Sequence, residues 1–474
     1  MKCPLIMVPV VAAVLFGGCA SVGPDYEGRP KVEHSSQFAG ASDLESAKLE
    51  SWWRQLGSGE LNRFVAQAFD NNHDVAIAAQ RLREARAMRE QAASAMLPHA
   101  GANASYSRVN PGSITGGGDL GGLGGGFSFD DPIKYWSSGI DISWEVDVFG
   151  GRRREARGAR AREQAEQEAM RGVQQALAAE VTETYFTVAS LREQLSTLDV
   201  QIANQEKQTE DTRAKTQAGA TSQLDLSRAL ARLENIRVER PTLESGITDQ
   251  VKRLALLLGQ RPDALDGQGV AAGAVPGKLP MTRVGMPAEL ILRRPDLRQS
   301  ERELAAATED IGVAVANFYP KFTIGATGPT SFGAKPGDLF DPAGYVWQFG
   351  PRVEWALFKG GANRAALEQA DARQKATLLG YEKAVLNAIG EVETELSNLK
   401  AETQRFTIVQ RARAASEDAV RRLHENFDVG AVSQIDVLVE ELALREIEIS
   451  EIRIKAQMLQ VWIRLHKALG GGWK

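Results

Sequence analysis

The stretch GATSQLDL at residues 219–226 recurs with conservative changes as GAVSQIDV at residues 430–437. The match extends toward the N-terminus, where WEVDVF at residues 144–149 is paired with VEWALF at residues 353–358. Motifs that repeat in the same order along a chain indicate an internal duplication. We therefore expect two copies of one structural unit to make up most of the protein.

Long helices are expected in each copy. Segments with almost no Pro or Gly favour helix, and the middle one in each copy has 67 residues, which would extend about 100 Å. The two shorter segments of a copy have a similar summed length, so we expect them to stack end to end beside the long helix. Pro241 lacks a backbone N–H and should kink its helix. The expected helices are residues 61–96, 152–218, 222–258, 287–318, 363–429 and 433–469.

The quoted stretch is the turn that joins a long helix to the next helix. Gly219 and Gly430 are expected to end the long helices, because glycine readily adopts the left-handed conformation of a helix C-cap. Ser222 or Thr221 can cap the helix that returns. Each copy is therefore expected to contain a helical hairpin with a glycine at its tip.

Four shorter segments alternate polar and apolar residues with the period of two that is typical of strands. Apolar residues on one face, with Trp and Tyr gathered nearby, are typical of transmembrane β-barrels. An amphipathic sheet on a soluble core would show the same alternation, but an export signal at the N-terminus favours the membrane. The expected strands are residues 99–109, 136–149, 320–330 and 345–358.

The N-terminus has the pattern of a signal peptide. Met1 and Lys2 precede an apolar run over residues 5–16, which is too short to cross a bilayer but fits an export signal. Gly17 and Gly18 before Cys19 resemble a lipobox, so we expect a lipoprotein signal peptide over residues 1–18 and lipidation of Cys19. The alternative is ordinary cleavage nearby, with Cys19 incidental.

The composition excludes several classes of protein. The chain is 43% hydrophobic and 25% charged, with a net charge of −5. No run of roughly 18 apolar residues follows the signal segment, which argues against transmembrane helices, and the acidic balance argues against nucleic acid as a partner. The histidines show no metal-ligand spacing, and no acid–base or nucleophile pattern stands out. We expect no enzyme activity, no catalytic residue, no metal site and no cofactor.

Four strands are too few to close a barrel, and lipid does not tolerate an open sheet edge. A membrane sheet in this chain therefore requires oligomerisation. Two chains would supply eight strands, whose interior side chains fill, and three would supply 12, with room for a lumen.

Short motifs are spread along the whole mature chain: CASVGPDY at 19–26, WW at 52–53, WEVDVFG at 144–150, LRRPD at 292–296, GP at 350–351, FKGG at 358–361, EVE at 391–393 and KALGGGW at 467–473. In combination they resemble the outer membrane factor family of TolC-like efflux channels, and in particular its NodT-type lipoprotein branch.

The resemblance implies a mixed α/β membrane protein built as a homotrimer. A 12-stranded β-barrel in the outer membrane, with four strands from each chain, would be continued by a 12-helix periplasmic α-barrel with an equatorial belt. The expected organisation is a lipid-anchored segment and belt over 19–60, repeat 1 over 61–258, a linker over 259–286, repeat 2 over 287–469 and a tail over 470–474.

The resemblance also implies a function. Such a protein is the exit channel of a tripartite efflux system and conducts small molecules, such as drugs, toxic compounds or metal ions, to the exterior. It would sit in outer-membrane lipid, with a periplasmic adaptor (a membrane fusion protein) and an inner-membrane RND-type transporter as partners. The alternatives are an exit duct for type I protein secretion and a non-conducting, lipid-anchored structural coiled-coil protein.

Roles for single residues follow from the same resemblance. Asp436 matches an aspartate that narrows the periplasmic end of such tunnels, and Asp225 is its counterpart in the first copy. The alternative for both is that each complements the dipole at a helix N-terminus. Gly219 and Gly430 would lie at the tips that contact the adaptor. The residues expected to line the barrel lumen are Asp141, Glu145, Asp147, Arg352 and Glu354.

The basic run Arg152-Arg153-Arg154 begins a long helix at the edge of the expected barrel. Basic side chains at a membrane surface attract anionic head groups, so we expect this run to face lipid. A plain solvated helix face is the alternative.

Overall fold

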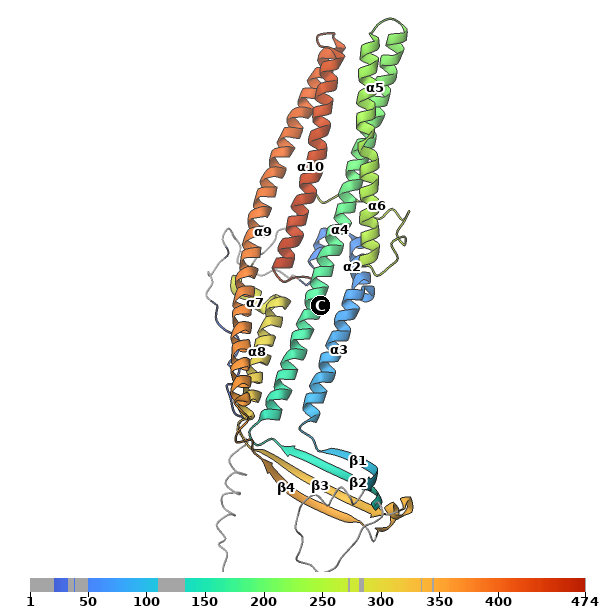
Figure 1. The fold of residues 1–474 in the computed structure, drawn as a ribbon. Helices are drawn as coiled ribbons and strands as arrows, with labels where there is room; N and C mark the ends of the chain where they lie inside the picture. Colours follow the sequence, from blue (N-terminus) through green and yellow to red (C-terminus); the bar gives the residue numbers. More distant parts are fainter. Residues whose placement is uncertain are drawn as a thin grey trace, which may run out of the picture. The chain divides into compact units, whose positions relative to one another are not determined.

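The computed structural model of the chain describes residues 21–32, 38, 50–109, 133–271, 273–280, 285–333, 335–342 and 345–473. The described residues form two compact units. One unit combines residues 21–29, 84–163 and 302–378, and the other combines the described parts of 30–83, 164–301 and 379–474. Several helices contribute residues to both units. Figure 1 labels the helices and strands.

The elements follow one another in the order of two copies. The first copy contains α2 (Gly59–Asn71), α3 (His73–Ser94), β1 (His99–Val109), β2 (Ile133–Val146), α4 (Gly151–Gln217), α5 (Gln223–Arg237) and α6 (Glu239–Leu257). The second contains α7 (Pro287–Arg293), α8 (Pro295–Ala316), β3 (Lys321–Gly333), β4 (Val346–Glu354), α9 (Ala362–Asp428) and α10 (Gln434–Ala468). The described residues also form the short 3-10 helices η1 (Trp52–Leu56) and η3 (Pro336–Phe340). A mixed α/β fold with duplicated elements is thereby confirmed.

The first short helix of each copy is broken, where the sequence pattern predicts one continuous helix. Asn72 is extended between α2 and α3, and its Oδ1 accepts hydrogen bonds from the backbone N–H groups of Asp74 and Val75, so it caps α3. Arg294 is extended between α7 and α8, because a residue that precedes a proline is driven out of the helical conformation. The predictions of unbroken helices over 61–96 and 287–318 are therefore wrong.

The returning helix of the first copy is interrupted at Val238, between α5 and α6. Pro241 lies one turn later, and it has no N–H with which to bond the carbonyl of Arg237. The second copy has no proline in α10, and that helix runs without a break over 35 residues. α4 and α9 have 67 residues each, which corresponds to about 100 Å of helix.

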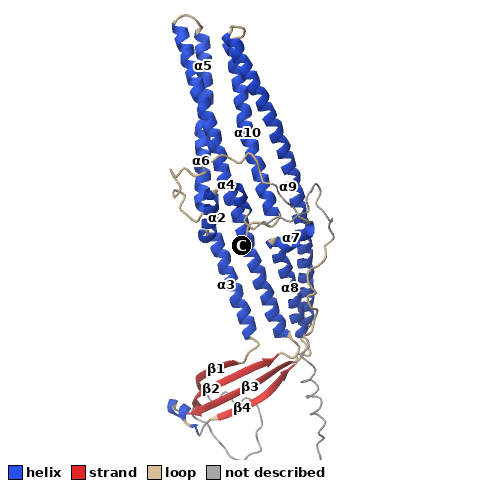
Figure 2. Cartoon of the chain, turned by 180° about the vertical axis from the view of Figure 1, so that it is seen from behind, coloured by secondary structure: helices blue, strands red, loops and turns tan. Residues whose placement is uncertain are grey.

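The strands form one four-stranded antiparallel sheet in the order β1-β2-β3-β4 (Figure 2). β2 begins and ends three residues before the predicted segment 136–149. β4 ends at Glu354, before the predicted end at residue 358. Both copies contain a tryptophan that ties the end of one strand to the start of its neighbour. Trp144, near the end of β2, donates its Nε1–H to the carbonyl of Met96, just before β1, at 2.9 Å. Trp355, just after β4, donates its Nε1–H to the carbonyl of Phe318, just before β3, at 3.0 Å.

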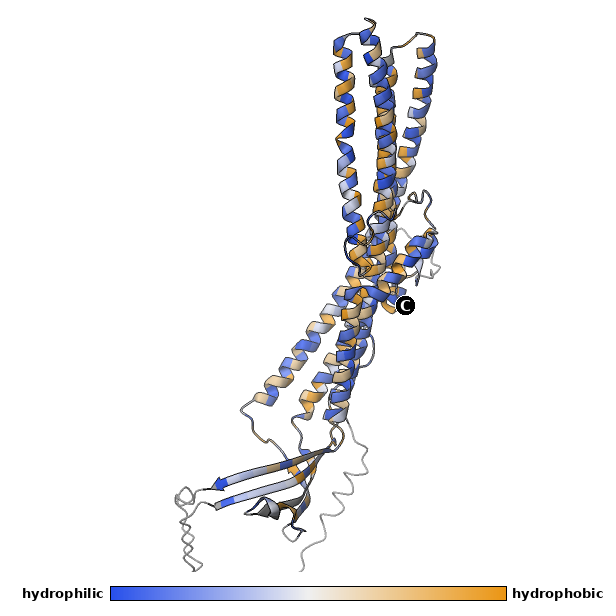
Figure 3. Ribbon diagram, turned by 90° about the vertical axis from the view of Figure 1, so that its right-hand side faces the viewer, coloured by the Kyte–Doolittle hydropathy of each residue, from blue (hydrophilic) through white to orange (hydrophobic). Residues whose placement is uncertain are grey.

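The largest hydrophobic core lies in the unit without the sheet. It gathers side chains from η1, α2, α4, α6 and α10, including Trp52, Leu61, Val181, Leu254 and Trp462. Elsewhere the helices carry interleaved hydrophilic and hydrophobic residues (Figure 3). Within the described residues, no helix combines the length and the apolar character needed to span a bilayer.

Candidate functional site

The two faces of the sheet differ in polarity. Directly opposite residues of antiparallel strands lie on the same face, so the pairs Ala100↔Ile142, Ile142↔Ala326 and Ala326↔Phe349 define an apolar row across all four strands. The large apolar side chains exposed on this face are Tyr106, Ile140, Ile142, Trp144, Trp347, Phe349 and Val353. Their exposure is characteristic of a surface that contacts lipid.

Four of the five predicted lumen residues lie on the polar face. Glu145, Thr323 and Arg352 form a cross-strand row from β2 through β3 to β4. Asp141 lies opposite Gly101 and accepts a hydrogen bond from Asn103. Glu354 lies opposite Lys321. The register therefore brings carboxylates and basic groups together on one side of the sheet.

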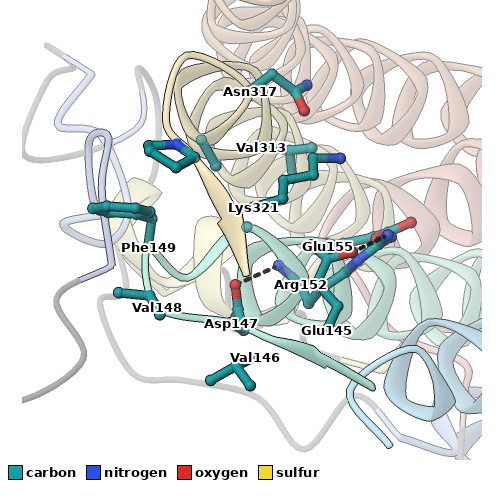
Figure 4. Close-up of a pocket in the computed structure, with 13 residues that line it drawn as sticks. Glu145, Val146, Asp147, Val148, Phe149, Arg152, Glu155, Val313, Asn317 and Lys321 are labelled. Carbon is teal, nitrogen blue, oxygen red and sulfur yellow. Dashed lines mark hydrogen bonds and ion pairs between the residues drawn. The ribbon is translucent and has the colours of Figure 1, made fainter. Parts of the chain in front are cut away.

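Asp147, the fifth predicted lumen residue, lies just beyond β2 and caps α4. Its carboxylate accepts hydrogen bonds from the backbone N–H groups of Arg152 at 3.2 Å and Arg153 at 2.9 Å, and from Arg153 Nε. Figure 4 shows it beside Arg152 at a small pocket that Val313, Asn317 and Lys321 also line. The first turn of a helix has free N–H groups, and this side chain satisfies two of them.

The three arginines that follow do not face lipid head groups as a free basic patch. Arg152 pairs with Glu145 at 2.9 Å and Glu155 at 3.0 Å, and the hydrogen bond that it donates to Glu145 raises the pKa of Arg152. Arg153 pairs with Asp147. Arg154 is fully buried. The head-group expectation is wrong for Arg154, because carboxylates and carbonyls of the same unit enclose its side chain. Arg152 and Arg153 keep about a third of their side chains exposed, and for them it stays a prediction.

The helical hairpins end as predicted. Gly219 and Gly430 have φ values of +75° and +74°, and after each glycine the next backbone N–H bonds back to a carbonyl five residues earlier, Ala220 to Lys215 and Ala431 to Asn426. These are the bonds of a Schellman motif, in which a left-handed residue ends a helix.

Asp225 and Asp436 each form a capping box at the start of the returning helix. The Oγ of Ser222 accepts a hydrogen bond from the Asp225 N–H, and the Asp225 carboxylate accepts one from the Ser222 N–H. Ser433 and Asp436 repeat this arrangement. The hydrogen bond from the serine hydroxyl is the main cause that lowers the pKa of each carboxyl, so both stay ionised at neutral pH.

The surroundings of the two aspartates differ. Asp225 also accepts a hydrogen bond from Thr221 at 3.0 Å and lies 3.7 Å from Arg228. In the second copy the matching positions hold Val432 and Val439, which offer neither a donor nor a positive charge. Asp436 is therefore the less compensated of the two negative charges.

Polar contacts join the two hairpins, and the sequence pattern did not reveal them. Glu441 of α10 accepts from Gln208 of α4 at 3.1 Å and contacts His424 of α9 at 2.9 Å. Farther along α10, Lys455 pairs with Glu193 of α4 at 2.6 Å. The Gln208–Glu441 and Glu193–Lys455 pairs are 233 and 262 residues apart in sequence, so only the packing of α4 against α10 shows them, whereas His424 and Glu441 belong to the same hairpin.

Cys19 and the glycine-rich stretch between β1 and β2 lie outside the described residues. Within the described part of the chain, no three His, Cys, Asp or Glu side chains are grouped so as to hold a metal ion.

Comparison with known proteins gives a consistent result. A family model described as outer membrane efflux protein matches residues 64–260 and 286–471. The chain is 27% identical to the probable outer membrane lipoprotein SilC of Salmonella typhimurium over 99% of both chains. It is 30% identical to the pyoverdine export outer membrane protein OpmQ of Pseudomonas putida, over 92% of this chain and 90% of that one.

A solved structure of the outer-membrane channel OprN superposes with a TM-score of 0.81 and 28% identity, over 96% of this chain and 100% of that chain. The residues that the family model matches, 64–260 and 286–471, include the four strands and both hairpin tips.

Proposed function

The chain belongs to the outer membrane efflux protein family, and on that premise we propose that three copies form one duct with a 12-stranded barrel and a 12-helix tunnel. The protein is a TolC-like outer-membrane exit channel of an efflux system.

The observation that carries the proposal is the four-stranded sheet with one apolar face and two edges. β1 and β4 are the outer strands of the described sheet, and their outward backbone groups need partners in lipid, where each unsatisfied group costs several kcal/mol. Because β1 and β4 run antiparallel, β4 of one copy can pair with β1 of the next. Twelve strands leave room for a lumen, whereas eight do not.

The polar face then lines the pore. Glu145 and Arg352 lie in one row, and Lys321 lies opposite Glu354, so this part of the pore carries both signs of charge. A mixed lining selects weakly by charge. We infer that the barrel passes small molecules of varied chemistry and that discrimination lies elsewhere in the system.

The periplasmic gate is assigned to the ring formed by three copies of Asp436. A ring of carboxylates in a water-filled pore favours cations, and Asp436 supports this role because its charge is less compensated than that of Asp225. Asp225 is assigned to helix capping, since Thr221 and Arg228 already engage its carboxylate. Gly219 and Gly430 shape the tips that would contact a periplasmic adaptor, which in turn would dock an inner-membrane RND-type transporter.

Cys19 is the proposed lipid attachment site. The pattern before it and the similarity to a probable outer membrane lipoprotein support the assignment. Residues 19–60 are assigned to a lipid-anchored N-terminal segment that continues into an equatorial belt around the tunnel, and residues 259–286 and the C-terminal tail are assigned to the same belt.

A type I secretion duct would use the same assembly, whereas a structural coiled-coil spacer would not. The exposed apolar face disfavours the spacer, because an aqueous sheet head would have to cover these side chains. Native mass spectrometry of the detergent-purified protein, with heat-modifiable mobility on gels, tests the assembly. A mass of three chains is expected, and a monomer at all concentrations would contradict the proposal.

A further inference from the structure

Arg154 is buried in the first turn of α4, and its guanidinium is surrounded by acceptors from the N-terminal segment. Its side chain has 0% exposure. Nε donates to the carbonyl of Val22 at 3.1 Å, Nη2 to that of Gly23 at 3.0 Å, and Nη1 to that of Pro24 at 2.8 Å. Three successive carbonyls of one peptide thus converge on a single side chain.

Two carboxylates complete the coordination. Glu309 of α8 contacts Nη1 at 3.1 Å, and Asp25 of the peptide contacts Nη2 at 2.9 Å. Four of these five acceptors belong to the N-terminal peptide, so without the peptide Arg154 would keep only its contact with Glu309. A buried guanidinium that loses its hydrogen-bond partners is strongly unfavourable, so the site is incomplete until the peptide occupies it.

The rest of the peptide is also held. The Val22 N–H donates to the carbonyl of Phe149 at 3.1 Å, and Ser21 accepts from Arg157 at 2.9 Å. Tyr26 packs against the small side chains of Ala161, Ala305 and Ala306, with the Arg302 guanidinium 5.7 Å from its ring.

Glycines allow the close approach of peptide and helices. A Cβ on Gly23, whose φ is +86°, would lie 2.7 Å from Cα of Gly312. A Cβ on Gly312 would lie 2.6 Å from Arg154 Cδ, and one on Gly150 would lie 2.6 Å from Ser21 Oγ. The space around the peptide therefore depends on three positions that lack side chains.

The peptide begins beside an aromatic cluster at one end of the sheet. Phe149, whose carbonyl binds Val22, lies 4.5 Å from Tyr319 and 6.4 Å from Phe322 between ring centroids. Aromatic residues gather at the boundary between lipid and water. Cys19 precedes Ser21 by two residues in the sequence.

We propose that Arg154 forms an internal binding site for the chain's own N-terminal peptide, residues 21–26, and that this site fixes the anchored N-terminus at the aromatic cluster. Arg154 is thus a positioning residue for the membrane anchor. The statement about the anchor rests on the proposed lipidation of Cys19, whereas the binding of the peptide does not.

Hydrogen exchange of the full-length protein in lipid nanodiscs, read by mass spectrometry over residues 21–26, tests the site. Gly23→Ala introduces the clash with Gly312. Gly28→Ala is the matched control, because Gly28 also has a positive φ, +104°, but a Cβ there has no neighbour within 4 Å. We expect exchange over residues 21–26 to become about tenfold faster in Gly23→Ala and to change by less than about threefold in Gly28→Ala. Equal exchange in the two variants would overturn the proposal.

Two further variants separate the site from the lipid. Arg154→Lys keeps the positive charge but loses the planar set of donors, so it should speed exchange at residues 21–26 in the same way; unchanged exchange there counts against the proposal. If this variant fails to fold, the glycine pair still decides. Cys19→Ser should lose acyl mass and yet keep the protection of residues 21–26. Loss of protection would mean that lipid, not Arg154, holds the peptide, whereas wild-type protein without acyl mass would refute only the lipidation.

Discussion

Acidification toward pH 4 should weaken the hydrophobic core around His466. This side chain of α10 is buried, and its ring lies 3.8 Å from the Trp462 ring and 5.6 Å from the Trp52 ring between centroids. Its Nδ1–H donates to the Trp462 carbonyl at 2.9 Å. Burial lowers the pKa of His466 from 6.5 to about 4, because the charged form is poorly solvated there.

The sign of the effect follows from which state binds more protons. Between pH 6.5 and 4 the unfolded chain protonates His466 and the folded chain does not, so stability falls as the pH falls through this window. From the two pKa values the loss is about 1.4 kcal/mol at pH 5.5 and about 2.6 kcal/mol at pH 4.5, with a limit of about 3.4 kcal/mol. Above pH 7.5 the contribution vanishes.

Local stability can be measured by hydrogen exchange of the amides in residues 462–469 at several pH values, after correction for intrinsic exchange. The wild type should lose protection at low pH by about the amounts given. His466→Phe keeps an aromatic ring but cannot titrate, so its opening free energy should depend less on pH. His73→Gln, a change at an exposed histidine, is the control and should follow the wild type. Parallel pH profiles for the wild type and His466→Phe would refute the reasoning.

Three other predictions concern the pore, the helix start and the membrane face. Asp436→Ala should move the cation-to-anion permeability ratio toward one, whereas Asp225→Ala should leave it unchanged, since Arg228 already compensates Asp225. The ratio is measured from reversal potentials in asymmetric salt. Equal effects of the two variants would contradict the assignment of Asp436 as the gate. Asp147→Ala should destabilise the start of α4 by about 1 kcal/mol, because the helix loses its cap. The measurement is the temperature at which the trimer dissociates, which should fall. Glu155→Ala leaves both capped N–H groups satisfied and should lower this temperature less. Phe349→Arg should disfavour membrane insertion by about 2–4 kcal/mol, whereas Gln348→Arg, on the opposite face of the sheet, should insert normally. Similar insertion yields for the two variants would show that the apolar face does not contact lipid and the polar face does not line the lumen.

The repeat and the polarity of the strands made much of the fold predictable from the sequence. A shared turn motif located both hairpins, and the absence of Pro and scarcity of Gly gave the 67-residue length of α4 and α9 correctly. The breaks at Asn72 and Arg294 were missed because composition favours helix on both sides of each position. Pro295 was a usable signal, since the residue before proline avoids the helical conformation.

The roles of single charged residues were harder to predict. Alternation placed Glu145 and Arg352 on one face correctly, but it extended the strand through Asp147, which instead caps α4. The run Arg152-Arg153-Arg154 has the composition of a surface patch, yet each arginine meets an acceptor that is local or distant in sequence. The acceptors of Arg154 lie more than a hundred residues away along the chain. The periodic patterns that identify helices and strands cannot reveal a contact between residues so far apart in sequence.

Single-channel recording of the purified wild-type protein in planar bilayers tests the account most directly. The account predicts discrete conductance steps that prefer cations and come only from the trimeric fraction, because three sheets are needed to enclose a lumen. A folded protein that inserts into the bilayer, remains monomeric and shows no conductance would contradict it.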